Sequence, residues 1–166
     1  MTTEIIIAAA EAHIGEVGGH STNIEVTLTL DTSVYASGDV LADTQIVTAC
    51  MRINGGKGIW QSLVLLDWDD QAGALDVLLL RTNVSIGTEN AAVSVTDTNA
   101  DEILGIVEIV AGDYVDLVGS QIVVRENIGM VVDAATTDDL YVAVISRDTK
   151  TYTASGITLK LGFLCD

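Results

Sequence analysis

The clearest pattern in the chain is a strict alternation over residues 24–30, where apolar residues occupy the even positions and Glu or Thr the odd ones. A period of two that includes β-branched residues is typical of a half-buried β-strand. Short apolar segments separated by turn residues recur along the chain and predict an all-β fold, a β-sandwich of jelly-roll type. The further strands expected are at residues 44–53, 59–68, 74–81, 106–110, 114–118, 121–125, 128–132, 140–147 and 157–163.

Two of these segments, residues 59–68 and 74–81, are apolar at almost every position. A strand that is apolar on both faces is covered on both faces, whereas a two-layer sandwich covers only the inner one. The outer face therefore needs a loop, an arm or a neighbouring subunit, and we favour a neighbouring subunit. The residues expected at such a subunit interface are Trp60, Leu63, Leu65, Trp68, Leu78 and Leu80.

The first 22 residues do not follow the strand rhythm, because an apolar run at positions 5–10 is followed by several glycines. We interpret residues 1–22 as an extended N-terminal arm outside a sandwich domain of residues 23–166. An apolar arm outside the core is expected to lie across a partner. The arm residues expected to contact that partner are Ile5, Ile6, Ile7, His13 and His20.

One short helix interrupts the strand pattern. Residues 97–102 contain a capping residue followed by acids, which the helix dipole favours in a first turn. Gly105 follows soon after, so this helix is expected to have only about one or two turns.

The charge of the chain excludes some classes of partner. The net charge is −17, yet the mean hydropathy is +0.44 and 49% of the residues are hydrophobic. With seven Lys and Arg against 24 Asp and Glu, the chain repels phosphate backbones, so nucleic acid is not expected as a partner. No apolar run is long enough to span a bilayer, and no basic segment of a signal peptide precedes the apolar run at 5–10. We expect synthesis in the cytoplasm, no membrane partner, and association through the surplus apolar surface.

The densest acidic cluster, Asp67, Asp69 and Asp70, raises the question of a cation site. It resembles a calcium loop only in part, because Gln71 replaces an acid and no Glu follows at the required distance. We favour a solvated hairpin turn over a metal site and expect neither metal nor cofactor, although the sequence leaves cation binding open.

Catalytic chemistry is not indicated either. The two histidines have no neighbouring ligand or nucleophile at a useful spacing, and no serine lies in a nucleophile elbow. Cys50 and Cys165 follow no metal or redox spacing. Two buried thiols are the favoured interpretation, with a disulfide left open. We expect a protein that is not an enzyme.

Several segments resemble a group of small virion proteins of tailed bacteriophages. They are Leu41-Ala42-Asp43-Thr44, Leu65-Leu66-Asp67-Trp68-Asp69-Asp70-Gln71, Asn83-Val84-Ser85-Ile86-Gly87-Thr88-Glu89-Asn90 and Thr153-Ala154-Ser155-Gly156-Ile157-Thr158-Leu159. The resemblance runs from about residue 24 to residue 163 and implies a β-sandwich structural protein of the phage particle.

Within that group we expect a capsid decoration (cement) protein on the outer capsid surface. It would bind the major capsid protein as a homo-oligomer, with a trimer expected from the role, and stabilise the shell against the pressure of packaged DNA. The alternative is a tail, baseplate or fibre component that binds a host-surface glycan, for which Trp60 and Trp68 are the candidate aromatic platforms. A jelly-roll enzyme, which would need a metal, is a third and weaker hypothesis.

Overall fold

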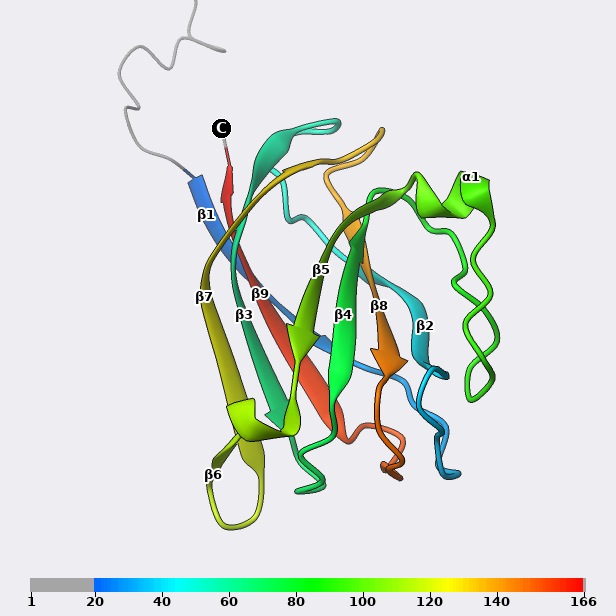
Figure 1. The fold of residues 1–166 in the computed structure, drawn as a ribbon. Helices are drawn as coiled ribbons and strands as arrows, with labels where there is room; N and C mark the ends of the chain where they lie inside the picture. The colour runs from blue at the N-terminus through cyan, green and yellow to red at the C-terminus, as the bar shows by residue number, and fades with distance from the viewer. Residues whose placement is uncertain (1–19, 166) are drawn as a thin grey trace, which may run out of the picture.

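The computed structural model describes residues 20–165 as two antiparallel β-sheets packed face to face (Figure 1). The five-stranded sheet has the order β1-β9-β3-β7-β6, and the four-stranded sheet has the order β2-β8-β4-β5. The expected all-β sandwich is therefore confirmed. The strands are β1 (His20–Thr27), β2 (Val40–Val47), β3 (Lys57–Asp67), β4 (Leu75–Leu80), β5 (Ile103–Ile109), β6 (Val115–Asp116), β7 (Gln121–Asp133), β8 (Leu140–Ser146) and β9 (Ile157–Cys165).

The short helix is also confirmed, as α1 (Asp97–Ala100), and a 3-10 turn follows at Ala111–Asp113. The cap of α1 is Thr96, whose side chain accepts a hydrogen bond from the Asn99 backbone N–H. The helix contributes no buried residue to either core, so it is a connection rather than a layer.

One strand is longer than the sequence suggested. Residues 121–125 and 128–132 were expected as two strands, but they form the single 13-residue strand β7. The register between β3 and β7 shifts at Trp60 and Ser62, opposite the segment of β7 that contains Asn127 and Gly129 with positive φ. A β-bulge accommodates Asn127 and Gly129 within β7. The chain therefore continues as one strand and does not turn back at these residues.

The main core lies between the two sheets and is almost entirely aliphatic, with Trp60 and Phe163 as its largest buried members on the five-stranded sheet. The Trp60 side chain is fully buried, and its indole N–H donates to the Ser62 carbonyl oxygen at 2.9 Å. Leu63 and Leu65 of β3 point into the same core. These three residues therefore face the opposite sheet rather than a neighbouring subunit, which corrects the expectation for them.

A second, smaller core covers the outer face of the four-stranded sheet. Leu78 and Leu80 of β4 pack there against Ile86 and its neighbours in the segment between β4 and α1. This segment is held against β2 by backbone hydrogen bonds, including one from the Val40 N–H to the Ala91 carbonyl. The outer face of β4 is thus covered by a loop of the same chain, and the prediction that Leu78 and Leu80 lie at a subunit interface is wrong.

The boundary of the arm also differs from the expectation. β1 begins at His20, which pairs with Cys165 of β9, so residues 20–22 belong to the sheet. His20 is exposed at this strand end. The arm candidates Ile5, Ile6, Ile7 and His13 lie outside the described residues.

Candidate functional site

The outer face of the five-stranded sheet carries a continuous group of apolar side chains at the end where β6 lies. The strand register places Leu66 of β3 beside Ile122 of β7, and Ile122 beside Val115 of β6. One pair further along, Val64 lies beside Val124. We call this group the apolar block; its members are Val64, Leu66, Trp68, Val115, Ile122 and Val124.

The apolar block is open to solvent. Val115 is 59% exposed, Trp68 is 52% exposed and Val124 is 49% exposed, whereas Val64, Leu66 and Ile122 are partly buried by their neighbours. Monomeric soluble proteins rarely leave a large contiguous apolar patch uncovered, and such patches commonly mark interaction sites. Of the six expected interface residues, Trp68 is the one that the structure brings to this surface, and its indole N–H donates to Thr158 Oγ1 on the same face.

A second apolar site lies at the opposite end of the same face. It is a groove of about 330 Å³ lined by Lys57, Gly58, Ile59, Val131, Leu164 and Cys165. We call it the end groove. Val131 is 77% exposed and Leu164 is 44% exposed. A Cβ atom on Gly58 would lie 2.7 Å from the Leu164 carbonyl oxygen, so glycine permits the close approach of β3 to β9 here.

A polar row separates the two apolar sites. Ser62 of β3 pairs with Glu126 of β7 and with Gly162 of β9. Nearby, Lys160 and Glu25 form an ion pair with a 3.3 Å separation between nitrogen and oxygen. Because both side chains are substantially exposed, this pair adds little stability. The charged side chains of this row are therefore the Lys160–Glu25 pair and the exposed acid Glu126.

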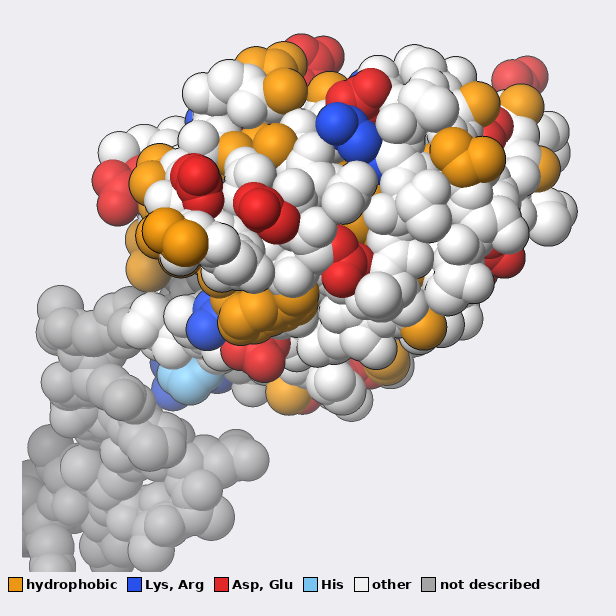
Figure 2. Space-filling model, turned by 90° about the horizontal axis from the view of Figure 1, so that it is seen from below, with side chains coloured by type: hydrophobic (Ala, Val, Ile, Leu, Met, Phe, Trp, Pro, Cys, Tyr) orange, Lys and Arg blue, Asp and Glu red, His pale blue; other side chains and the backbone are white. Residues whose placement is uncertain are grey.

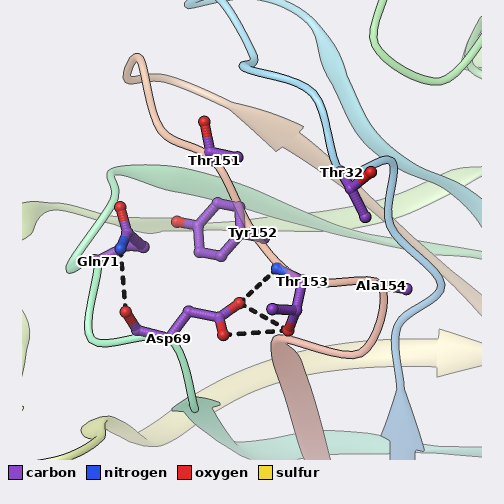
Figure 3. Close-up of a pocket in the computed structure, with 7 residues that line it drawn as sticks. All are labelled: Thr32, Asp69, Gln71, Thr151, Tyr152, Thr153 and Ala154. Carbon is purple, nitrogen blue, oxygen red and sulfur yellow. Dashed lines mark hydrogen bonds between the residues drawn. The ribbon is translucent and has the colours of Figure 1, made fainter.

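A polar-edged pocket lies among the loops at the β6 end of the sandwich (Figure 3). It is an open groove of about 430 Å³, and we call it the threonine groove because Thr32, Thr151 and Thr153 line it with Asp69, Gln71, Tyr152 and Ala154. The Asp69 carboxylate accepts hydrogen bonds from the backbone N–H of Thr153 at 2.6 Å and from its hydroxyl at 3.0 Å. Asp69 therefore ties the β3–β4 turn to the loop before β9.

Asp67, at the end of β3, is fully buried. Its carboxylate accepts three backbone N–H groups from the turn that follows, those of Asp69 at 3.0 Å and of Gln71 and Ala72 at 2.8 Å. Burial raises the pKa of Asp67 above its ordinary value, and the three hydrogen bonds offset part of that rise. The Asp67 carboxylate thus fixes the backbone of the β3–β4 turn through these three hydrogen bonds.

The three acids of the cluster do not converge on one point. Asp67 faces the turn backbone, Asp69 binds Thr153, and Asp70 accepts from the side-chain amide of Gln121 at 2.7 Å. Among residues 20–165, no group of three or more His, Cys, Asp or Glu side chains is arranged to hold a metal ion.

Tyr152 lies at the floor of the threonine groove, and only 2% of its surface is exposed. Within the described part of the chain its buried hydroxyl has no hydrogen-bond partner, and burial raises its pKa. A sugar ring stacks on the open face of an aromatic side chain, and Tyr152 does not offer one. Tyr152 therefore gives the groove no stacking platform.

Both cysteines are buried, and no disulfide joins them. The Cys165 thiol donates to the Cys50 carbonyl oxygen at 3.1 Å, and burial raises the pKa of Cys50 to about 12. The preferred interpretation of buried thiols is confirmed.

Sequence reasoning missed the exposed residues Val115, Val124, Val131 and Leu164. For Val124, Val131 and Leu164, the signal was the alternation within β7 and β9, where buried Val123, Val132 and Phe163 occupy the opposite parity. An apolar residue at the outward parity of a strand was the feature to look for.

Comparison with protein-family models and with curated proteins gives no match to this chain. Over residues 20–165, none of the helical segments has the length and apolar character required to cross a bilayer.

Proposed function

We propose that the chain is a structural protein of a tailed-bacteriophage particle, specifically a capsid decoration protein that docks on the outer shell. The observation that carries the proposal is the apolar block on an otherwise acidic molecule. The resemblance of the turn and strand segments to phage virion proteins supplies the biological setting. The partners proposed are the major capsid protein and further copies of this chain, with a trimer expected from the role.

We also propose that the sandwich is of jelly-roll type. The strand orders support this interpretation: without β6, they are β1-β9-β3-β7 and β2-β8-β4-β5. In both sheets an early strand pairs with a late one, as expected when two Greek-key connections wrap a pair of sheets.

The mechanism is binding energy rather than catalysis. Burial of apolar surface contributes about 25 cal/mol for each Å² removed from water. A subunit that spans two neighbouring capsid subunits makes their separation under internal pressure less favourable. The 24 acidic residues against seven basic ones favour a place on the outside of the shell, away from DNA.

Substitution within the apolar block tests this function. Val124→Asp places a charge on an exposed outward position of β7, so the fold is retained while apolar docking is lost. Ile106→Asp is the matched control, because Ile106 is similarly exposed, at 45% against 49%, but lies on β5 of the other sheet.

The measurement is co-sedimentation of purified protein with shells assembled from the major capsid protein of the same phage. We expect Val124→Asp to bind at least tenfold more weakly and Ile106→Asp to bind like the wild type. Equal binding of the wild type and Val124→Asp would refute docking through the apolar block. A whole-particle reconstruction that places the chain in the tail would refute the decoration role.

A glycan-binding role in a tail or fibre is the second candidate, and the exposure of Trp68 favours it. Trp60 cannot serve as a platform because it is fully buried. Binding on a glycan array that disappears in Trp68→Ala, together with unchanged shell binding, would reverse the ranking.

A further inference from the structure

The hairpin between β6 and β7 ends in two exposed apolar side chains. Leu117 is 51% exposed and Val118 is 93% exposed, and the turn is closed by a hydrogen bond from the Leu117 N–H to the Ser120 carbonyl oxygen at 2.9 Å. We call Leu117 and Val118 the hairpin tip. Figure 1 shows that this hairpin projects beyond the lower end of the sheet. Seen from that end, hydrophobic side chains reach the surface at several places, with acidic side chains between them (Figure 2).

The backbone of the hairpin tip is unfavourable for the residue that it carries. Val118 has a φ of +76°, in the left-handed region, where a β-branched residue is a genuine outlier. Glycine or asparagine is the usual choice in such a turn. Val118 thus has a strained backbone and an apolar side chain that is exposed to solvent. Residues with a strained backbone are often found at functional positions.

The end groove provides an apolar surface at the other end of the same sheet. It lies at the beginning of β3, whereas the hairpin tip follows β6 near the end of β3. β3 has 11 residues, so the two features are separated by about 33 Å along the strands. The same molecule therefore presents a projecting apolar tip at one end and an apolar groove at the other.

The charges around the two features are complementary. Asp116, beside the hairpin tip, accepts a hydrogen bond from the Val118 N–H and is exposed. At the end groove, Lys57 pairs in register with Asp133, whose carboxylate already forms an ion pair with Arg81. Among the described residues that line the groove, Lys57 alone is charged. In a chain with seven basic residues against 24 acidic ones, a basic side chain at the groove favours the approach of an acidic hairpin.

We propose that the hairpin tip of one copy of this chain inserts into the end groove of a second copy. The inference rests on the proposed function and deepens it by naming the contact through which the subunits associate. Because tip and groove lie at opposite ends of one face, the contact is heterologous. Repetition of such a contact generates a closed ring when the rotation between copies closes, as the expected trimer requires.

Two substitutions, one on each side of the contact, test the proposal. Val118→Asp removes the apolar tip, and Val131→Asp places a charge in the end groove. Both positions are highly exposed, at 93% and 77%, so both variants are expected to fold with an unchanged circular dichroism spectrum. Ile106→Asp on the other sheet serves again as the matched control.

The readout is the mass of the purified full chain by sedimentation or light scattering. We expect the wild type and Ile106→Asp to form an oligomer, and Val118→Asp and Val131→Asp each to have the mass of one chain. A mixture of the two monomeric variants should then form a species of two chains, because one intact tip meets one intact groove.

Three outcomes would overturn the proposal: a monomeric wild type, oligomers of unchanged mass in either variant, or a mixture that remains monomeric. Each leaves the proposed function open, because shell binding is measured separately through Val124→Asp in the apolar block. Loss of shell binding in Val124→Asp with self-association unaffected by Val118→Asp would show that only the tip-and-groove contact is wrong.

Discussion

The buried carboxylate of Asp67 gives a quantitative test of what holds the β3–β4 turn. The carboxylate satisfies the backbone N–H groups of Asp69, Gln71 and Ala72, and the turn needs positive φ at Asp70 and Ala72. The side chain is fully buried, so no solvent path serves its oxygens directly. Removal of this acceptor is therefore expected to destabilise the folded protein.

The magnitude follows from the number of donors that lose their acceptor. Each backbone hydrogen bond contributes about 1 kcal/mol net, and a buried donor without a partner costs about 1–3 kcal/mol. For Asp67→Ala we expect a loss of about 3 kcal/mol in the free energy of unfolding, since water can enter part of the exposed turn. Asp67→Asn should lose about 1–2 kcal/mol, because its carbonyl oxygen can keep two of the three bonds and a neutral group avoids the burial of charge.

Urea denaturation followed by circular dichroism measures these differences. Asp70→Ala is the matched control: Asp70 lies in the same turn, is exposed and binds only the side chain of Gln121 among the hydrogen bonds described. Its loss should be about 1 kcal/mol or less, because Asp70 has a positive φ that alanine adopts less readily than aspartate. The reasoning fails when Asp67→Ala costs no more than Asp70→Ala, or when Asp67→Asn costs more than Asp67→Ala.

Three further changes have defined outcomes. Val118→Gly should raise the urea midpoint, because relief of about 1–2 kcal/mol of left-handed strain exceeds the entropic cost of about 0.5–1 kcal/mol for glycine; a lower midpoint would contradict the strain. Burial raises the pKa of Cys50 from 9.0 to about 12, so the folded thiol keeps a proton that the unfolded thiol releases. The contribution of Cys50 to stability is therefore complete below pH 9 and is lost as the pH rises toward 12. The buried thiol of the native protein should also react slowly with a thiol reagent at pH 8. Fast labelling before unfolding would contradict the burial. Gly156→Ala should lower the unfolding midpoint, since its Cβ would lie 1.9 Å from Asp69 Oδ2, whereas Gly112→Ala, with no atom within 4 Å, is the neutral control; equal effects of both would contradict the steric argument.

The inner faces of the strands were predictable from the sequence because alternation reports burial directly. Val26 and Leu28 follow the alternation that predicted the first strand, although that strand begins and ends earlier than expected. The same rule applied to β7 would have marked Val124 as outward and Val123 as inward. Strand existence and side-chain parity are local properties, so local patterns indicate them.

The covering of the outer faces was not predictable in this way. Leu78 and Leu80 are buried by residues 84–95, a segment without clear periodicity whose position depends on backbone hydrogen bonds to β2. The role of Asp67 likewise depends on a turn with positive φ at two non-glycine residues, which no acidic spacing reveals. Contacts of this kind arise from tertiary structure, and a continuous apolar run is compatible with either a loop or a partner.

The two sheets together resolve the contrast between high hydropathy and high negative charge. On the four-stranded sheet, a loop of the same chain buries the outward apolar side chains of β4. On the five-stranded sheet, no described loop plays that part, and the apolar block remains exposed, with the Lys160–Glu25 ion pair and the acid Glu126 nearby on the same face. At physiological ionic strength, salt screens the repulsion between charges that are more than about 8 Å apart. Contact between two copies through the outer face of the five-stranded sheet is therefore opposed mainly by the charges on or near that face. The exposed apolar block on a chain of net charge −17 is thus the place where association costs least.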